Sequence, residues 1–230
     1  MIALVTGAGS PRGIGAACVR ALKERGAEVA YTILRGEAPP GDVPGTAFET
    51  DLSEADAPER LLDAVTERIG HPSVLVNNAA HSTRDGFETL DADTIDAHYA
   101  VNVRAPMLLS ALLARAGRPG RIVNLVSGQF LGPMPGELAY TASKGALEAF
   151  TRQLAAEVAH LGITVNAVGP GPNDTGWIDD DLRAELLPHF PMGRLGRPED
   201  AAAVVAWLCS EEAGWVTGQV IHAEGGFVRG

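Results

Sequence analysis

The 230-residue chain carries 29 acidic against 18 basic residues, a formal net charge of −11, and 46% of its residues are hydrophobic. This acidic balance disfavours nucleic acid or an anionic membrane surface as a partner, and no apolar run approaches the ~18 residues of a membrane span. The two cysteines, Cys18 and Cys209, are typical of small buried residues in a reducing compartment. A strand that begins at Ile2 leaves no room for a signal peptide. We therefore expect one cytoplasmic domain spanning residues 1–230.

The hydrophobic pattern predicts strands that alternate with helices along the chain. Strands are predicted near 2–6, 27–33, 46–50, 73–77, 121–126, 163–168 and 218–222. Helices are predicted near 13–25, 53–69, 91–115, 140–160 and 198–209, with a shorter one near 179–187. This alternation indicates an α/β fold, a single doubly wound parallel sheet of about seven strands with helices on both faces. Such sheets bind ligands outside the carboxyl ends of their strands.

A glycine-rich turn follows the first predicted strand. IALVT is followed by GAGSPRGIG and then by an amphipathic helical pattern. Gly7, Gly13 and Gly15 would let the backbone turn tightly and approach a pyrophosphate, to which the next helix presents its free N–H groups. Strand, turn and helix in this order predict a dinucleotide site. A helix preceded by a flexible loop is the alternative.

Three residues in the middle of the chain predict proton-transfer chemistry. Tyr140 and Lys144 lie four positions apart on a predicted helix, so that phenol and ammonium share one face. The charge would lower the pKa of the phenol from its usual value near ~10. Ser127, at the end of the predicted strand RIVNLVS, would hold a substrate oxygen. The alternative is a surface tyrosine beside a solvated lysine.

These motifs resemble those of the short-chain dehydrogenase/reductase family, over essentially the whole chain. The matching stretches are TGAGSPRGIG, Asp51-Leu52, NNAA at 77–80, Asn102, Ser127, YTASK at 140–144 and PGPNDT at 170–175. The resemblance is closest to 3-oxoacyl-carrier-protein reductases. It implies a Rossmann-type fold, a nicotinamide coenzyme, and a catalytic tetrad of Asn102, Ser127, Tyr140 and Lys144. In that tetrad Asn102 would hold a water of a proton relay, or else pair only with neighbouring backbone.

Two departures from the family pattern concern the coenzyme-binding segments. Five residues separate Gly7 from Gly13, where the family usually has three, and NNAA replaces the commoner NNAG. The resemblance implies coenzyme contacts from Gly7, Ser10, Arg12, Gly13, Ile14, Gly15, Arg35, Asp51, Leu52, Asn78, Ala79, Tyr140, Lys144, Pro170, Gly171 and Thr175. Asp51 would accept a hydrogen bond from the adenine amine, or serve as an ordinary cap for a helix beginning near Ser53.

The choice of coenzyme is predicted from charge. A carboxylate about 20 residues after the glycines would bind the ribose 2′-hydroxyl of NAD. The second predicted strand instead ends in Ile33, Leu34 and Arg35 without a carboxylate. Arg35, with Arg12 in the glycine loop, could bind a 2′-phosphate, and two solvated arginines are the alternative. The sequence thus favours NADP(H) over NAD(H).

The expected activity is NADP(H)-dependent hydride transfer to and from a carbonyl or secondary alcohol, with 3-oxoacyl thioesters among the candidate substrates. Residues 128–135 and a lid near 170–193 would form the substrate pocket. His81 and His189 could contact substrate, and plain surface histidines are the favoured alternative. Without a cluster of ligands at metal-binding spacing, we predict no metal. A non-catalytic redox sensor that binds the dinucleotide is the competing function.

The expected assembly is a homotetramer or a homodimer. Two predicted helices show apolar stripes beyond those needed against the sheet, namely Met107, Leu108, Ala111 and Leu112 on one, and Leu147, Phe150, Leu154 and Val158 on the other. The resemblance implies a four-helix interface built from 91–115 and 140–160, and a second interface through 198–209 and the final strand. The alternative is that all these side chains pack within the subunit. Pro106 is expected to kink the first of these helices.

Overall fold

A single seven-stranded parallel sheet forms the centre of the molecule in the computed structural model, which describes residues 1–228 and leaves the last two residues of the expected domain undescribed. The strands are β1 (Ile2–Val5), β2 (Glu28–Ile33), β3 (Thr46–Glu49), β4 (Val74–Asn77), β5 (Gly120–Leu125), β6 (Ile163–Gly169) and β7 (Val220–His222). Their order is β3-β2-β1-β4-β5-β6-β7, and all neighbours are parallel. The chain reverses its direction of progress between β1 and β4, where such folds bind ligands. The sheet predicted from the sequence is confirmed.

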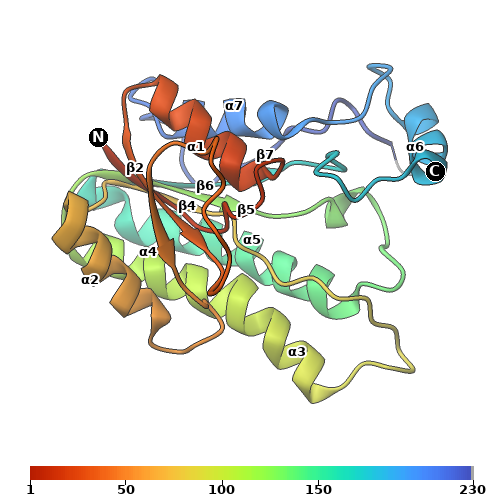
Figure 1. Ribbon diagram of the computed structural model, residues 1–230, viewed down its shortest axis with the longest axis horizontal. Helices are drawn as coiled ribbons and strands as arrows, with labels where there is room; N and C mark the ends of the chain where they lie inside the picture. The colour runs from red at the N-terminus through yellow and green to blue at the C-terminus, as the bar shows by residue number, and fades with distance from the viewer. Residues whose placement is uncertain (229–230) are drawn as a thin grey trace.

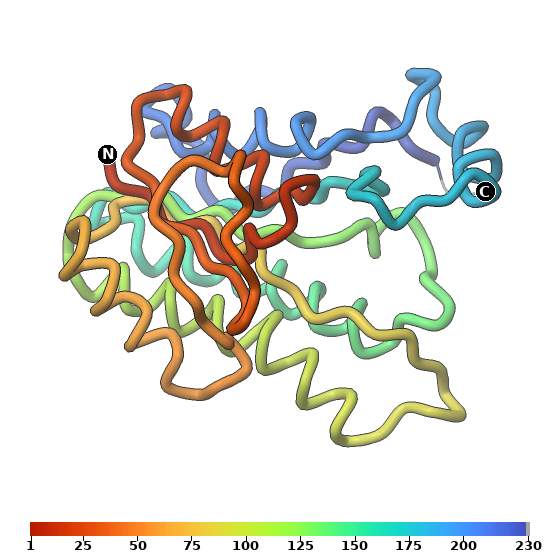
Figure 2. The backbone as a smooth tube through the Cα atoms, viewed as in Figure 1, coloured from red at the N-terminus to blue at the C-terminus, as the bar shows by residue number. Residues whose placement is uncertain are grey.

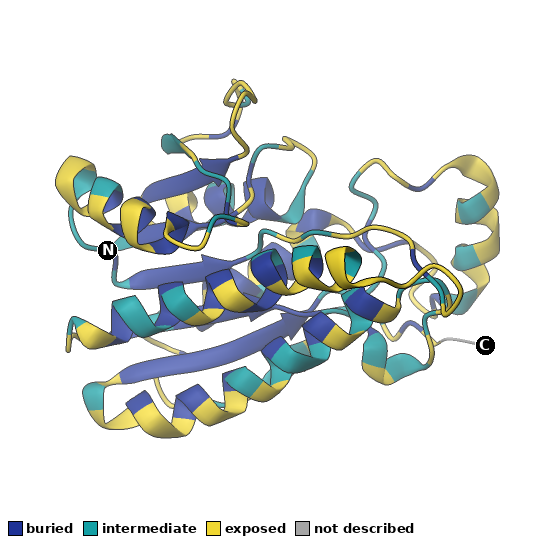
Figure 3. Ribbon diagram, turned by 90° about the horizontal axis from the view of Figure 1, so that it is seen from below, coloured by how far each residue is buried: buried dark blue, intermediate teal, exposed yellow. Residues whose placement is uncertain are grey.

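Helices cover both faces of the sheet (Figure 1). One face carries α1 (Ile14–Glu24) and α7 (Pro198–Leu208), and the other carries α2 (Ala57–Ile69), α4 (Ala105–Arg115) and α5 (Leu138–Val158). Each of these helices buries one side and exposes the other, while the strands β4 and β6 are buried throughout (Figure 3). Within residues 1–228, no helix combines the length and apolar character needed to cross a membrane.

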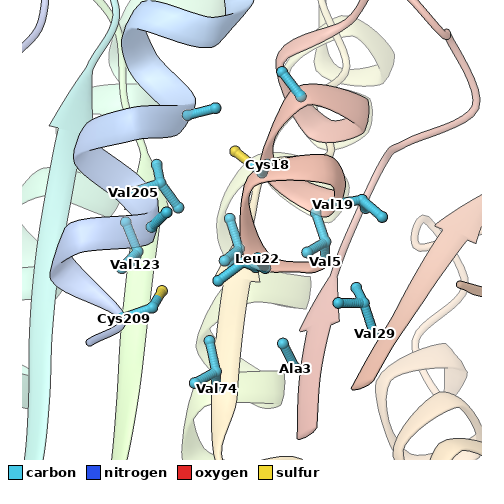
Figure 4. Close-up of a cluster of buried hydrophobic side chains, with 14 of the residues drawn as sticks. Ala3, Val5, Cys18, Val19, Leu22, Val29, Val74, Val123, Val205 and Cys209 are labelled. Carbon is cyan, nitrogen blue, oxygen red and sulfur yellow. The ribbon is translucent and has the colours of Figure 1, made fainter. Parts of the chain in front are cut away.

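The larger core lies between the sheet and the pair α1 and α7 (Figure 4). Cys18 and Leu22 from α1 meet Val205 and Cys209 from the other helix, over small and branched side chains of the strands. Both cysteines are free thiols, and burial raises the pKa of each. They therefore pack as small apolar side chains rather than as reactive ones.

The helix predicted at 91–115 is interrupted at Asn102, a residue of the expected tetrad. It consists of α3 (Ala92–Tyr99), a π-helical turn over Ala100–Arg104, and α4. Pro106 follows this turn within one continuous helical run, so it lacks the N–H that would bond to the preceding turn, and its ring crowds the carbonyl four residues earlier, that of Asn102. The irregularity therefore lies in the turn before Pro106, where a proline disturbs a helix. The turn contains Asn102, and π-helical turns frequently mark functional sites.

Two further expectations about helices need correction. The helix expected from about Ser53 begins at Ala57, with a turn between them. On α5, the second apolar stripe faces inward: Leu147, Leu154 and Val158 are all buried in the subunit's own core. The predicted second apolar face of α5 is therefore wrong.

The loops after the central strands extend to one end of the molecule (Figure 2). They include the segments after β4, β5 and β6, and the last of these continues into α6 (Asp180–Leu186). Because all strands are parallel, these loops leave the same edge of the sheet. Every motif identified in the sequence is thus collected around this carboxyl edge.

Candidate active site

The glycine-rich turn forms a cradle that side chains could not share. Gly7 has φ 73°, and a Cβ added there would lie 2.7 Å from Cα of Ala79. A Cβ on Gly15 would lie 2.3 Å from the carbonyl oxygen of Gly7. Glycine is therefore required at both positions. Gly13 is the N-cap of α1 and provides no side chain, so the first N–H groups of this helix suit an anionic ligand.

The two additional residues of the loop are accommodated in a local turn. The N–H of Gly13 donates to the carbonyl of Ser10 at 3.0 Å, which closes the loop before α1 begins. The N–H of Gly7 donates to Oγ1 of Thr32 at 2.8 Å and fixes the start of the loop against β2. The longer loop therefore keeps the helix N-terminus at the carboxyl edge of the sheet.

Asn78 supports this cradle from the neighbouring strand end. Its Nδ2 donates to the carbonyls of Thr6 at 2.9 Å and Gly7 at 2.8 Å. The N–H groups of Asn78 and Ala79 both donate to Oγ1 of Thr6 at 3.0 Å. Both amide hydrogens of Asn78 are thus used to hold the glycine loop, which is a structural use of a predicted coenzyme contact.

A cavity of about 660 Å³ lies beside the cradle. Its lining brings together six of the predicted coenzyme contacts, Gly7, Ser10, Asp51, Leu52, Asn78 and Ala79. Hydrogen bonds from the N–H and hydroxyl of Ser53, at 2.9 and 2.7 Å, lower the pKa of the Asp51 carboxyl. Because α2 starts later, this carboxylate caps a turn instead of the helix.

The arginines expected in this cavity are not in its lining. Arg12 forms an ion pair with Asp174 at 3.7 Å, and Arg35 forms one with Glu54 at 3.5 Å. Besides Asp51, the cavity is lined by the carboxylate of Glu37, which follows β2 and accepts the N–H of Leu34 at 3.1 Å. The expectation that no carboxylate stands at this end of β2 is therefore corrected.

The sequence did not reveal Glu37 because it lies beyond the end of the strand. Its own N–H donates to the carbonyl of Leu34 at 3.0 Å, so the chain turns back immediately after β2. The carboxylate oxygen consequently lies 2.3 Å from the place that a Cβ of Gly9 would take. The consecutive Arg-Gly-Glu after the strand was the only available signal of this turn.

A second cavity, of about 790 Å³, lies over the ends of β5 and β6. It is lined by Ile14, Ser127, Tyr140, Pro170, Gly171 and Thr175 of the predicted site. Met134, Trp177, Leu182, Leu186 and Phe227 make much of its remaining wall apolar, and Arg84, Glu137 and Glu185 are its charged members. His189 also lines it, and His81 lines the first cavity, so both histidines belong to the site region and not to plain surface.

Tyr140, Ser127 and Lys144 converge at this cavity. The hydroxyl of Tyr140 is hydrogen-bonded to Ser127, and Nζ of Lys144 lies 5.8 Å from the centre of the phenol ring. Lys144 is 2% exposed and donates to the carbonyl of Leu125 at 2.8 Å. Burial lowers the pKa of Lys144 to about 8. Since both groups sit on the first two turns of α5, helical spacing alone brings them together.

The pKa of Tyr140 is raised, contrary to the expected lowering by Lys144. Burial of the phenol is the main cause, and the charge of Glu137 adds to it, while the hydrogen bond with Ser127 opposes it. In the chain without coenzyme the phenol therefore stays protonated at neutral pH. Such a group is prepared to donate a proton rather than to accept one.

Asn102 is fully buried and binds the protein through its whole side chain. Its Oδ1 accepts the N–H of His81 at 2.7 Å, and its Nδ2 donates to the carbonyl of His81 at 2.9 Å. The same Nδ2 donates to Oγ of Ser143 at 2.9 Å, and Ser143 donates to the carbonyl of Tyr140 at 2.7 Å. Both amide hydrogens are thus used within the protein. Ser143 was not among the residues predicted for the site, and its position next to Lys144 was the only feature of the sequence that pointed to it.

No group of three or more metal-binding side chains occurs among residues 1–228. The paired glycine cradle and the adjacent uncapped helix fit a dinucleotide pyrophosphate, since backbone can approach closely there. The residues present therefore fit a nicotinamide coenzyme.

Comparisons with known proteins agree with this geometry. Residues 7–228 match the family model described as enoyl-(acyl carrier protein) reductase. The oxidoreductase YjdA of Bacillus subtilis (strain 168) is 48% identical, over 100% of this chain and 97% of the relative. The 3-oxoacyl-[acyl-carrier-protein] reductase FabG of Vibrio cholerae is 34% identical, over 98% of this chain and 96% of its own length.

The chain belongs to the short-chain dehydrogenase/reductase family. Solved members share its backbone: a short-chain dehydrogenase/reductase from Serratia marcescens superposes with a TM-score of 0.89 at 33% identity, covering 99% of this chain and 98% of the other. The reductase LugOII, described as catalysing keto-reduction, superposes with a TM-score of 0.87 at 36% identity, covering 98% and 96%. As a family member, the chain is an oxidoreductase of the kind that binds a nicotinamide coenzyme.

Proposed function

We propose that this short-chain dehydrogenase/reductase catalyses reversible hydride transfer between NADP(H) and a carbonyl/secondary-alcohol pair, with reduction as the physiological direction. The observation that carries the proposal is the convergence of Tyr140, Ser127 and buried Lys144 on one cavity at the carboxyl edge. The nicotinamide coenzyme, when bound, supplies the hydride.

The protein's own residues provide the proton and the orientation. Ser127 donates a hydrogen bond to the carbonyl oxygen and holds it beside the phenol. Tyr140, kept protonated by its raised pKa, then gives its proton to that oxygen. Lys144 stabilises the phenolate that remains. Asn102 holds the loop after β4 against α5 and so supports the proton relay from a structural position.

The wall of the cavity favours a substrate with an apolar body. Met134, Trp177 and Phe227 offer apolar surface, whereas the charged members comprise one arginine and two carboxylates. A negatively charged group on the substrate would gain little binding free energy here, because the two carboxylates outnumber the single arginine. Ketones with apolar substituents are therefore the preferred class, with 3-oxoacyl thioesters second. Residues 170–193, which include α6, act as the lid of the single domain.

The proposed coenzyme is NADP(H), and its 2′-phosphate would be bound by Arg12 and Arg35. Both guanidinium groups are about two-thirds exposed, 68% and 66%, and their present carboxylate partners are at 3.7 and 3.5 Å. Such exposed pairs contribute only about 0–1 kcal/mol, so a phosphate can replace them. Glu37 opposes this choice, because its carboxylate lines the cavity beside the glycine cradle.

We further propose a homotetramer or homodimer in a reducing compartment such as the cytoplasm. The stripe on α4 supports it: Met107 is 39% exposed, and with Leu108 it lines a hollow of about 730 Å³. The buried stripe on α5 supplies no comparable face. Sedimentation at micromolar concentration tests the assembly, and a 24 kDa monomer would refute it.

The test of the function is a screen of coenzyme oxidation. NADPH and NADH are each offered with a panel of apolar ketones, 3-oxoacyl thioesters and 2-enoyl thioesters, and Tyr140→Phe serves as the blank. We expect turnover on carbonyl compounds only. Tight coenzyme binding without turnover on any of them would instead favour a redox sensor of the same fold.

A further inference from the structure

The segment of residues 81–85, between β4 and α3, is held by hydrogen bonds that include those of His81, Thr83 and Asp85. Asn102 in the π-helical turn binds both backbone groups of His81 at 2.7 and 2.9 Å. The N–H of Thr83 donates to Nε2 of His98 at 3.3 Å, from the preceding turn of the same helical run. We call residues 81–85 the β4 segment.

His98 provides a neutral, fully buried anchor for the β4 segment. Its Nε2 accepts from Thr83, so its Nδ1 carries the proton and donates to the carbonyl of Thr94 at 2.7 Å. The ring packs edge to face against His81 at 4.8 Å and against Tyr140 at 6.5 Å. One end of the β4 segment is therefore fixed to α3 and to the π-helical turn.

The other end of the β4 segment is fixed to the start of α5 through Asp85. Its carboxylate accepts the N–H of Leu138 at 2.5 Å and that of Ala139 at 2.8 Å. Its own N–H donates to the carbonyl of Gly136 at 2.9 Å. Asp85 is only 7% exposed. The N-cap residue Glu137 makes no side-chain cap bond, so a residue 53 positions away in sequence performs the capping.

We infer that Asp85 is a positioning residue for the reaction: it fixes the first turn of α5, and with it Tyr140, relative to Asn102. Tyr140 lies one residue beyond the second N–H that Asp85 binds, in the turn that would fray first without a cap. Lys144 is held separately, one turn further on, by the carbonyl of Leu125. Loss of Asp85 therefore moves the phenol more than the ammonium. This inference rests on the proposed function.

The geometry makes this effect specific to turnover. Asp85 lines neither cavity, and none of its bonds reaches the glycine cradle. A misplaced phenol slows proton transfer, because small displacements of a catalytic group reduce rates strongly. Coenzyme binding at the cradle should be nearly unaffected. A purely structural cap would lower stability alone and leave kcat intact.

The test compares Asp85→Ala and Asp85→Asn with the matched control Asp91→Ala. Asp91 also caps a helix, accepting the N–H of Thr94 at 2.8 Å, but it is exposed and lies on α3. Three quantities are measured well below each melting temperature. They are kcat with the best carbonyl substrate, the coenzyme Kd, and amide hydrogen exchange at Leu138 and Ala139.

We expect Asp85→Ala to lower kcat by about tenfold or more, with coenzyme Kd within about threefold of wild type and faster exchange at both amides. Asp85→Asn, which keeps one acceptor, should have a kcat between those of Asp85→Ala and wild type. The control Asp91→Ala should keep kcat within about twofold of wild type. Wild-type kcat, or wild-type protection of Leu138 and Ala139, in Asp85→Ala would overturn the inference.

Two other outcomes are also decisive. If Asp85→Ala does not fold, the isosteric Asp85→Asn decides by the same measurements, and wild-type values in it overturn the inference. If the wild-type chain turns over no carbonyl compound, the proposed function fails. The amide exchange then still shows whether Asp85 holds the first turn of α5.

Discussion

The residues proposed for catalysis and the two arginines proposed to bind the 2′-phosphate differ in how firmly they are held. Lys144 is 2% exposed and Asn102 is fully buried, and each is hydrogen-bonded to backbone. Arg12 and Arg35 are 68% and 66% exposed, and they pair with Asp174 and Glu54. Burying a charge requires a fixed partner, whereas an exposed charge can change partners at little cost. We therefore expect the groups proposed for catalysis to keep their positions and the two arginines to be able to change partners when a coenzyme binds.

The largest expected effect is the loss of turnover in Tyr140→Phe, which changes the proposed general acid. A positioned general acid contributes typically ~10²–10⁴ in rate, so turnover should fall by that factor while coenzyme Kd is unchanged. Tyr99→Phe removes a phenol that is 37% exposed and serves as control. Steady-state kinetics and a coenzyme titration measure both. Substantial activity in Tyr140→Phe would remove the tyrosine from its role.

The next effect concerns the charge on Lys144, and Lys144→Met should lower kcat by about 10². Lys23→Met is the matched control, since Lys23 is the only other lysine and is exposed on α1. Because burial depresses the pKa of Lys144 to about 8, below its ordinary value, the ammonium is lost as pH rises through about 8. Wild-type reduction should therefore decline above that pH. A flat profile up to pH ~10, the ordinary pKa of a phenol, would contradict this.

A smaller effect is expected from the two arginines proposed to bind the 2′-phosphate. Wild-type protein should bind NADPH at least about tenfold more tightly than NADH, a difference of about 1.4 kcal/mol. Arg12→Ala and Arg35→Ala should each reduce this preference by weakening NADPH alone. Isothermal titration with both coenzymes measures it. Equal affinities in the wild-type protein would mean that the arginines do not select the coenzyme.

The smallest effect comes from Glu37, whose carboxylate faces the cavity that would take the 2′-phosphate. Glu37→Gln should strengthen NADPH binding by about threefold through loss of repulsion, with NADH unchanged or weaker. Glu28→Gln, at the opposite end of β2, is the control. Weaker NADPH binding in Glu37→Gln would show that this carboxylate supports the coenzyme instead of opposing it.

The difference between buried and exposed side chains also explains what could be predicted from the sequence. Buried strands and helical spacing determine where Ser127, Tyr140 and Lys144 lie, so the sheet and the convergence of these three side chains were predictable. The partners of surface side chains depend on loop paths, which sequence patterns do not specify. Thus the turn that brings Glu37 back to Gly9 was missed.

Contacts between segments distant in the sequence were also beyond prediction. Asp85 caps a helix that starts 53 residues later, and Asn102 bonds to Ser143 across 41 residues. No local pattern announces either contact. The buried stripe of α5 was misjudged for a related reason, because the sequence does not show how much of each helix its own sheet covers.

Transfer of deuterium from the coenzyme tests the central claim most directly. The protein is incubated with NADPH deuterated at the transferable position of the nicotinamide and with the best carbonyl substrate, and the product is examined by mass spectrometry. The account predicts one deuterium on the carbinol carbon of the alcohol, and a transfer rate in Tyr140→Phe lower by at least ~10². Bound coenzyme with no deuterium in any product, or deuterium on a former carbon–carbon double bond, would contradict it.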